Sequence, residues 1–258
     1  MPSPTTRRAA GRPTPSIRGV PPHVVAAPAK LTVSLRVTGV RSDGYHEIDA
    51  EMVALDLADE LVFSDGDGLE VVEAGTGLPV PADDDNLVRR ALRAVGRRAH
   101  VVLTKRIPAG AGLGGGSSDA AAVLRWAGVV DDPQLAAGLG ADVPFCVVGG
   151  RARVRGIGEV VEPLPFEPAT FTLATPPFGC ATPAVYQAWD DLGGPTGAGP
   201  NDLEPAALAV EPRLAGWRDA LADATGEVPV LAGSGSTWFV PGAHPDAGTV
   251  VRTAPPFG

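Results

Sequence analysis

The stretch Ile107–Leu124, IPAGAGLGGGSSDAAAVL, places five glycines within seven positions and then turns into an alanine-rich run. Glycines at positions 110, 112, 114, 115 and 116 leave backbone N–H groups open to a ligand and adopt positive φ angles at little cost. Ser117 or Ser118 is expected to cap the following helix, whose N-terminus carries unpaired N–H donors and the positive end of the helix dipole. Together these features predict an anion site, most naturally for phosphate.

Three familiar kinds of glycine loop match this stretch poorly. A P-loop requires a lysine after its last glycine, and no lysine follows a glycine in this chain. A protein-kinase loop requires H-R-D and D-F-G motifs downstream, and neither occurs. The dinucleotide fingerprint G-x-G-x-x-G is formally present from Gly110 to Gly115, with Asp131 near the place of an acidic ribose ligand. Its context is missing, because Lys105–Pro108 separates the preceding strand from the first glycine.

The composition limits the class of protein. The 258 residues are 44% hydrophobic, enough for one sizeable core or two smaller cores packed together. A net charge of −9 argues against nucleic-acid binding through a broad basic surface. No apolar run approaches the ~18 residues of a membrane span. Cys146 and Cys180 form no C-x-x-C pair, which favours a reducing, cytoplasmic location. Residues 1–23, rich in Pro, Arg, Ser and Thr, are expected to be a disordered extension.

Lysine is rare in this chain. Of 21 basic residues, only Lys30 and Lys105 are lysines. A lysine kept among arginines is a candidate for a compact point charge that a guanidinium group cannot replace. Apolar residues at positions 31, 33, 35 and 37 alternate with polar ones, the period of a strand with one buried face. Lys30 and Thr32 are therefore expected on the same polar side, whereas Lys105 is interpreted as structural or as a weak phosphate neighbour.

Hydrophobic periodicity predicts the remaining elements. Helices are expected at 86–98, 118–126, 134–139, 183–190 and 204–221, and strands at 100–104, 145–148, 152–154, 171–174 and within 230–240. The proline-spaced segment 163–168 is expected to divide the chain into subdomains of residues 24–165 and 166–258, because few core contacts cross such a segment.

The glycine stretch belongs to a longer pattern. Pro108-x-Gly-x-Gly-Leu-Gly-Gly-Gly-Ser-Ser-Asp-Ala-Ala resembles the phosphate loop of the GHMP small-molecule kinases, named for galactokinase, homoserine, mevalonate and phosphomevalonate kinases. Further stretches resemble one family within them, the 4-diphosphocytidyl-2-C-methyl-D-erythritol kinases. These stretches are Ala27–Leu35, Arg41–Glu47, Leu139–Phe145, Asn201–Pro205 and Ala232–Thr237. The agreement extends from about Val25 to Val240.

The resemblance implies a fold and an activity. The implied fold is α+β, the GHMP kinase fold, with an N-terminal ribosomal-protein-S5-like nucleotide-binding subdomain and a C-terminal ferredoxin-like subdomain. The implied activity is ATP-dependent phosphorylation of the 2-hydroxyl of 4-diphosphocytidyl-2-C-methyl-D-erythritol, in the non-mevalonate route to isoprenoid precursors. Mg²⁺ is expected to accompany ATP, held mostly by phosphates and water with Ser118 as a protein ligand. The expected assembly is a monomer or a weak dimer.

The resemblance also assigns roles to individual residues. Asp142, held by Pro144 two residues on, would accept or orient the proton of the attacked hydroxyl, and Lys30 would keep Asp142 ionised. Tyr45 and His46 would bind the cytidine, since a tyrosine ring stacks on a pyrimidine and histidine hydrogen-bonds its edge. Further substrate contacts are assigned to Thr32 and Tyr186. The implied ATP-binding residues are Pro108, Ala109, Gly110, Ala111, Gly112, Leu113, Gly114, Gly115, Gly116, Ser117 and Ser118.

Two alternatives stay open at this point. The first is another GHMP kinase, of the mevalonate or homoserine type, although the stretch Arg41–His46 favours a nucleotide-linked substrate. The second is a catalytically weak nucleotide-binding paralogue. Thr32 stands where the family commonly has asparagine, and the interval 118–140 is about one short helix smaller than usual. The retained Lys30 and Asp142 argue against this second alternative.

Overall fold

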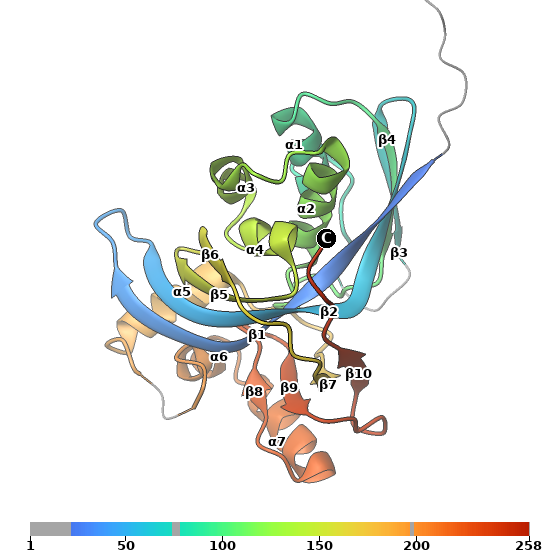
Figure 1. Cartoon of the computed structure of the whole chain (residues 1–258). Helices are drawn as coiled ribbons and strands as arrows, with labels where there is room; N and C mark the ends of the chain where they lie inside the picture. Colours follow the sequence, from blue (N-terminus) through green and yellow to red (C-terminus); the bar gives the residue numbers. More distant parts are fainter. Residues whose placement is uncertain (1–21, 74–77, 197–198, 258) are drawn as a thin grey trace, which may run out of the picture.

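The computed structural model describes residues 22–73, 78–196 and 199–257. Residues 1–21 of the predicted N-terminal extension lie outside these ranges. A six-stranded sheet carries the helices α1 to α4 on one face, and a four-stranded sheet with further helices lies below it (Figure 1). The α+β class predicted from the sequence is confirmed. Within the described ranges, no helix has the length and apolar character that crossing a membrane requires.

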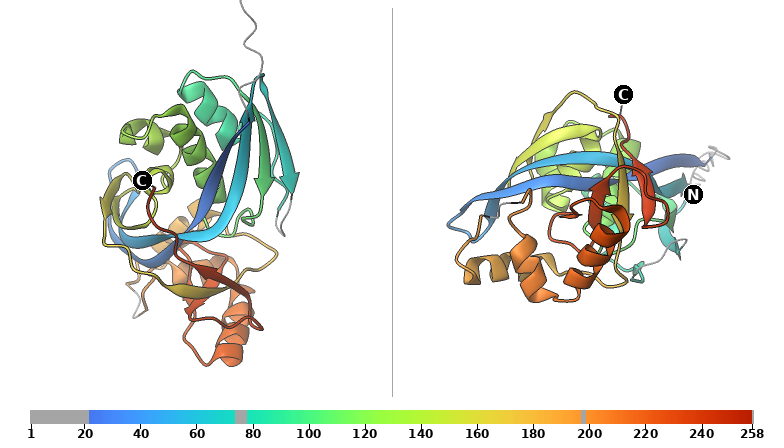
Figure 2. Two further views of the ribbon diagram at one scale, coloured as in Figure 1. Left: turned by 45° about the vertical axis from the view of Figure 1, so that its right-hand side comes forward. Right: turned by 90° about the horizontal axis from the view of Figure 1, so that it is seen from below.

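A long hairpin organises the larger sheet. Strands β1 (His23–Val40) and β2 (His46–Ser64) pair antiparallel along most of their length. One end of β2 also pairs with β4 (His100–Lys105), and the other end pairs with β5 (Arg151–Gly156). β3 (Gly68–Glu73) lies parallel to β4, and β6 (Val160–Pro163) continues beyond β5. β2 therefore reaches both halves of the sheet. Because β1 pairs with β2 along most of its length, β1 also crosses the molecule from one side to the other (Figure 2).

Irregularities in β1 set the direction of its side chains. The register against β2 shifts between Pro28 and Lys30 and again between Thr32 and Ser34. Such bulges bend a strand and re-aim its side chains. Leu31 consequently packs into a small core cluster, whereas Leu35 belongs to the large one. The first bulge places the Lys30 side chain at the position described below.

Four helices cover one face of the large sheet: α1 (Leu87–Ala94), α2 (Gly115–Ala127), α3 (Pro133–Leu139) and α4 (Val143–Val148). The stretch Ala120–Leu124 of α2 has no exposed surface. Its small side chains allow α2 to lie close to its neighbours α1, α4 and β1. The alanine-rich run of the sequence is therefore the central core helix of this layer.

Two of these helices differ from the sequence-based expectation. α2 begins at Gly115 rather than Ser118, and its N-cap is Gly114 with no side-chain cap. Residues 143–148 form helix α4, so the strand expected at 145–148 is wrong. A short apolar run does not distinguish a buried strand from a buried helix. Pro144 lies in the first turn of α4, where its missing N–H leaves no hydrogen bond unmade.

The second sheet is antiparallel, in the order β10-β7-β9-β8. Its strands are β7 (Thr170–Ala174), β8 (Val230–Leu231), β9 (Trp238–Pro241) and β10 (Thr249–Arg252), and its helices are α5 (Thr182–Asp191), α6 (Glu204–Val210) and α7 (Leu214–Thr225). The single helix expected at 204–221 is divided near Pro212, which cannot donate a helical hydrogen bond. The large core cluster contains Leu61 of β2 and Trp238 of β9, so the two sheets share buried surface. The subdomain boundary near residue 165 stays a prediction.

Candidate active site

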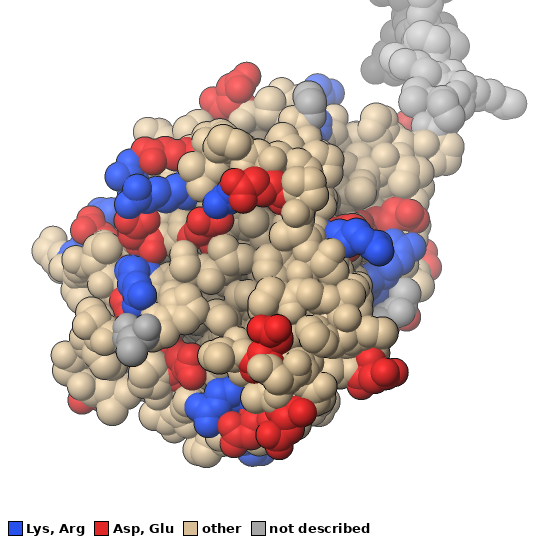
Figure 3. All heavy atoms as spheres, turned by 60° about the horizontal axis from the view of Figure 1, so that its bottom comes forward, with Lys and Arg blue, Asp and Glu red and all other residues tan. Residues whose placement is uncertain are grey.

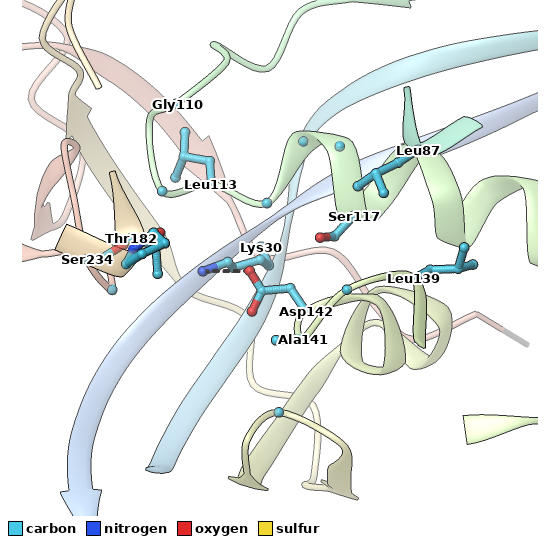
Figure 4. Close-up of a pocket in the computed structure, with 18 of the residues that line it drawn as sticks. Lys30, Leu87, Gly110, Leu113, Ser117, Leu139, Ala141, Asp142, Thr182 and Ser234 are labelled. Carbon is cyan, nitrogen blue, oxygen red and sulfur yellow. Dashed lines mark hydrogen bonds and ion pairs between the residues drawn. The ribbon is translucent and has the colours of Figure 1, made fainter. Parts of the chain in front are cut away.

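A cavity of about 1300 Å³ collects nearly all the residues selected from the sequence. Its lining comes from β1, the glycine loop, α5, the turn before α4 and the turn after β5. The predicted residues on the lining are Lys30, Thr32, Tyr45, His46, Pro108, Ala109, Gly110, Ala111, Gly112, Leu113, Gly114, Gly115, Gly116, Ser117, Asp142 and Tyr186. Figure 4 shows Lys30 and Asp142 facing each other beside the glycine loop.

The glycine loop is held tightly against its surroundings. Gly110, Gly112 and Gly114 have φ angles of 75°, 78° and 69°, a region that favours glycine. A Cβ on Gly112 would lie 2.5 Å from the carbonyl oxygen of Gly235 in the loop between β8 and β9. Leu113 is 1% exposed and anchors the loop in the core. The loop is thus a fixed cradle rather than a flexible linker.

The first turn of α2 presents backbone donors to the cavity. The first hydrogen bond of this helix runs from the N–H of Ser118 to the carbonyl of Gly114, at 2.9 Å. The N–H groups of Gly115, Gly116 and Ser117 precede that bond and have no acceptor inside the helix. All three residues line the cavity. This arrangement suits an anionic ligand such as a phosphate group.

Lys30 and Asp142 form an ion pair on the cavity wall. The Lys30 Nζ lies 3.4 Å from Asp142 Oδ2 and donates to Thr32 Oγ1 at 3.1 Å. The Lys30 side chain is 7% exposed and that of Asp142 is 30% exposed. The N–H of Lys30 also donates to the carbonyl of Leu113, which ties β1 to the glycine loop. A cation, a carboxylate and the glycine loop therefore meet on the lining of one cavity.

A second group of lining residues includes aromatic rings. The rings of His46 and Tyr186 lie 4.7 Å apart between centroids, and Trp189 meets His46 edge-on at 5.6 Å. His46 Nε2 lies 2.8 Å from Asp190 Oδ1. Burial raises the pKa of the Tyr186 hydroxyl, so this group stays neutral. Tyr45 is 60% exposed and stands at the rim.

Lys105 lies beneath the glycine loop rather than within it. Its Nζ donates to Asp59 and, at 2.8 Å, to Asp119 Oδ2, and all three side chains are buried. A Cβ on Gly115 would lie 3.1 Å from this ammonium group. Burial raises the pKa of Asp119 to about 7, opposed by the charge of Lys105. The geometry supports the interpretation of Lys105 as a structural residue beside the glycine loop.

Ser118 does not fit the metal-binding role expected for it. Its hydroxyl donates to the carbonyl of Pro28 at 2.6 Å and lies 3.3 Å from Cys146 Sγ. The residue is 1% exposed and lies behind the lining of the cavity. Because α2 starts three residues earlier than expected, Ser118 already points into the fold. Its role here is to join α2 to β1 and α4.

The structure adds lining residues that the sequence did not suggest. Asp190 contacts His46 across 144 positions of the chain, so no local pattern indicates the pair. Glu159 comes from the turn after β5, which carries no motif. Asn86 is the N-cap of α1 and accepts from Val88 N at 2.9 Å. The capping pattern identifies Asn86 as a helix start but gives no sign that it faces the cavity.

The chain resembles proteins of one enzyme class. Residues 86–150 match the model of the GHMP kinases N terminal domain. A solved structure titled "Crystal structure of 4-(cytidine 5'-diphospho)-2C-methyl-D-erythritol kinase" superposes with a TM-score of 0.72 at 34% identity, covering 90% of this chain and 98% of the other. A mevalonate kinase from L. major superposes with a TM-score of 0.60 at 12% identity, covering 92% and 97% of the two chains, which shows a shared fold.

The fold, the glycine loop and the matched domain define a GHMP kinase, a small-molecule phosphotransferase. Its more similar relatives indicate which family of GHMP kinases the chain belongs to. The 4-diphosphocytidyl-2-C-methyl-D-erythritol kinase of Paracoccus denitrificans (strain Pd 1222) is 40% identical over 234 residues, 83% of this chain and 85% of the relative. That of Granulibacter bethesdensis (strain ATCC BAA-1260 / CGDNIH1) is 38% identical over 262 residues, 87% of each chain. The chain belongs to the family of 4-diphosphocytidyl-2-C-methyl-D-erythritol kinases.

Proposed function

We propose that this chain transfers the γ-phosphoryl group of ATP to the 2-hydroxyl of 4-diphosphocytidyl-2-C-methyl-D-erythritol. The observation that carries the proposal is that three kinds of functional group line one cavity. The backbone donors of the glycine loop and α2 belong to its lining, and so does the His46–Tyr186–Asp190 group. The Lys30–Asp142 pair belongs to the same lining.

Asp142 and Lys30 have complementary roles in this proposal. Phosphoryl transfer asks the protein mainly to align the nucleophile and to stabilise spreading charge. The Asp142 carboxylate is the partly exposed member of the pair and accepts or orients the hydroxyl proton. Lys30 is held by Thr32 and Asp142, so its ammonium group is fixed where negative charge develops. Thr32 acts here through Lys30.

The charges of the lining support a need for Mg²⁺. Among the described residues, two lysines and six carboxylates line the cavity, the acidic ones being Asp83, Asp85, Asp119, Asp142, Glu159 and Asp190. A polyphosphate in this setting requires added positive charge. Asp119 Oδ1 is buried without a hydrogen-bond partner, which fits a nearby cation. No cluster of three or more metal-ligating side chains occurs in the described ranges, so phosphate oxygens and water would supply most ligands. Bound Mg²⁺ would neutralise charge that develops on the phosphate oxygens.

The aromatic part of the cavity lining supports a nucleobase as part of the acceptor. Tyr186 and His46 offer ring faces, and Tyr45 stands at the rim where it can close over a bound base. The contact with Asp190 leaves one nitrogen of His46 free to hydrogen-bond a base edge. Mevalonate and homoserine have no ring that would use these surfaces.

The direct test measures ADP release by the purified protein with three acceptors. Turnover is expected with 4-diphosphocytidyl-2-C-methyl-D-erythritol and only background release with mevalonate and homoserine. Phosphorus NMR of the product locates the new phosphate ester at the 2-hydroxyl. Preferred turnover of mevalonate or homoserine would instead establish another GHMP kinase. An absence of turnover with all three would support the nucleotide-binding paralogue.

Replacing His46 by alanine is expected to raise the KM of the cytidine-containing substrate about tenfold while the KM of ATP stays unchanged. One hydrogen bond of ~1–1.5 kcal/mol to the base edge corresponds to about that factor. His244→Ala serves as a control, because His244 lies in the loop after β9 and outside the cavity lining. If His46→Ala changed the KM of ATP, the assignment of His46 to the base-binding part of the site would be wrong.

The remaining expectations concern partners and location. On the face drawn in Figure 3, basic and acidic atoms are interspersed and form no continuous basic patch among the described residues. This supports our proposal that the chain binds no nucleic acid. A monomer or weak dimer, and a cytoplasmic location without membrane association, stay predictions from composition and resemblance.

A further inference from the structure

Arg125 joins the three elements that carry the proposed catalytic groups. It lies in the last turn of α2, whose first turn follows the glycine loop. Its Nη1 donates to the carbonyl of Cys146 in α4 at 2.6 Å, and its Nη2 donates to the carbonyl of Ala26 in β1 at 2.8 Å. Asp142 is the N-cap of α4, and Lys30 lies four residues after Ala26 in β1.

Ser118 repeats this pattern two helical turns earlier on the same face of α2. Its hydroxyl donates to the carbonyl of Pro28 and contacts the thiol of Cys146. Among the named strands of the described residues, β1 pairs only with β2, and its bridge to Asn201 lies further along at Leu35, so the carbonyls of Ala26 and Pro28 can accept from α2. Two side chains of α2 thus hold both β1 and α4 in place. Burial lowers the pKa of Arg125 to about 10, which still leaves the group charged at neutral pH.

A segment that follows the second sheet closes over this guanidinium group. After β10 the chain runs along β2, where Ala254 N donates to Ala54 O at 2.8 Å. It then reaches the corner between α4 and β5, where Pro256 forms a bridge with Gly149. The Phe257 ring lies over Arg125, with the guanidinium carbon 3.8 Å from its centroid. Figures 1 and 2 show this end of the chain beside α4.

The corner between α4 and β5 is shaped to receive the segment. Gly149 and Gly150 have φ angles of 68° and 67°. A Cβ on Gly149 would lie 2.9 Å from the Phe257 ring, and one on Gly150 would lie 3.0 Å from Pro256. The N–H of Phe257 also donates to the carbonyl of Val148, at 3.4 Å. Glycine is therefore needed at both positions for the segment to approach.

We propose that Arg125 and Phe257 form a latch that positions Asp142 and Lys30 relative to the glycine loop. Both are positioning residues, since neither lines the cavity. Phe257 restricts the guanidinium by stacking on it, and the guanidinium fixes α4 and β1 through their carbonyls. The proposal rests on the proposed function, because it concerns the alignment of the same transfer reaction.

The first measurement is kinetic, at a temperature where every variant is folded by circular dichroism. Phe257→Ala and Arg125→Lys are expected to lower kcat about 10- to 100-fold while both KM values stay within about twofold, since a displacement of ~1 Å can cost about 100-fold. Phe257→Tyr keeps the ring and should retain wild-type kcat. Trp217→Ala in α7 is the matched control, because Trp217 is 37% exposed and Phe257 is 38% exposed. Wild-type kcat in Phe257→Ala would overturn the proposal.

The second measurement needs no substrate. Amide hydrogen exchange in α4 is expected to accelerate at least tenfold in Phe257→Ala and Arg125→Lys, but not in Phe257→Tyr or Trp217→Ala. Unchanged exchange in α4 would also overturn the latch. If wild-type protein released no ADP while the exchange pattern followed this expectation, the proposed function would fail and the latch would stand. The two failures are therefore distinguishable.

Discussion

Replacing Asp142 by asparagine is expected to lower kcat about 1000-fold, within the range of about 10²- to 10⁴-fold that general acid–base groups contribute. Asparagine keeps the size of the side chain but loses the negative charge. The partner of Lys30 at 3.4 Å becomes neutral, and no carboxylate at this position accepts the hydroxyl proton. The KM of ATP should stay within about twofold, because in the proposed site the glycine loop and α2, rather than Asp142, would hold the phosphate groups. Steady-state ADP release at saturating substrates measures the change.

Asp131→Asn provides the control for this variant. Asp131 is an exposed loop carboxylate between α2 and α3, and it lies outside the cavity lining. Its replacement removes one charge and should leave kcat unchanged. If Asp142→Asn retained more than about a tenth of wild-type kcat, the loss would be far smaller than that expected for a missing proton acceptor. The assignment of Asp142 would then be wrong. Thermal unfolding of both variants shows whether any loss comes from folding.

Replacing Gly114 by alanine is expected to lower kcat/KM about 100-fold, since a displacement of ~1 Å in the site can cost that much. Gly114 has a φ angle of 69°. A Cβ there would lie 2.7 Å from Cγ of Lys30 and 3.2 Å from its Cε. The methyl group therefore displaces the lysine stem and strains the backbone by about 1–2 kcal/mol. Thermal unfolding reports the strain, and kinetics reports the displacement.

A second glycine separates these effects from the general consequences of alanine. Gly216 lies exposed in α7, and a Cβ there would meet nothing within 4 Å. Gly216→Ala should stabilise the protein by about 1 kcal/mol, because alanine favours the helix, and leave kcat/KM unchanged. Wild-type kcat/KM in Gly114→Ala would show that the lysine stem adjusts without cost, contrary to the fixed cradle described above.

Local patterns in the sequence selected glycine-loop residues that the structure places together on the cavity lining, but they misplaced the start of α2. Glycine permits positive φ angles through its own backbone, so the loop can be identified without knowing which other segments pack against it. The start of α2 could not be identified in this way, because the sequence predicts that a serine caps the helix. In the structure the Ser118 hydroxyl is instead satisfied by the carbonyl of Pro28, 90 positions away.

Helix α4 shows a second limit. Its residues Val143–Val148 form an apolar run that suits either a strand or a buried helix. The choice between strand and helix depends on the surroundings. α4 packs against α2 and α3, and Arg125 donates a hydrogen bond to the carbonyl of Cys146 in α4. The strand expected there would have removed the N-terminal position that Asp142 occupies.

The sequence by itself predicted an anion-binding loop, because the glycines act through short-range backbone conformation. The α+β class and the residues of the proposed transfer site were implied by the resemblance to a known family, whose motifs can be matched along the sequence. Only the tertiary structure decided that Asp190 orients His46 and that Phe257 covers Arg125. Contacts of this kind depend on strand register and on how far β1 crosses the molecule. The strand register and the path of β1 follow from the packing of the whole chain, so no local pattern in the sequence indicates them.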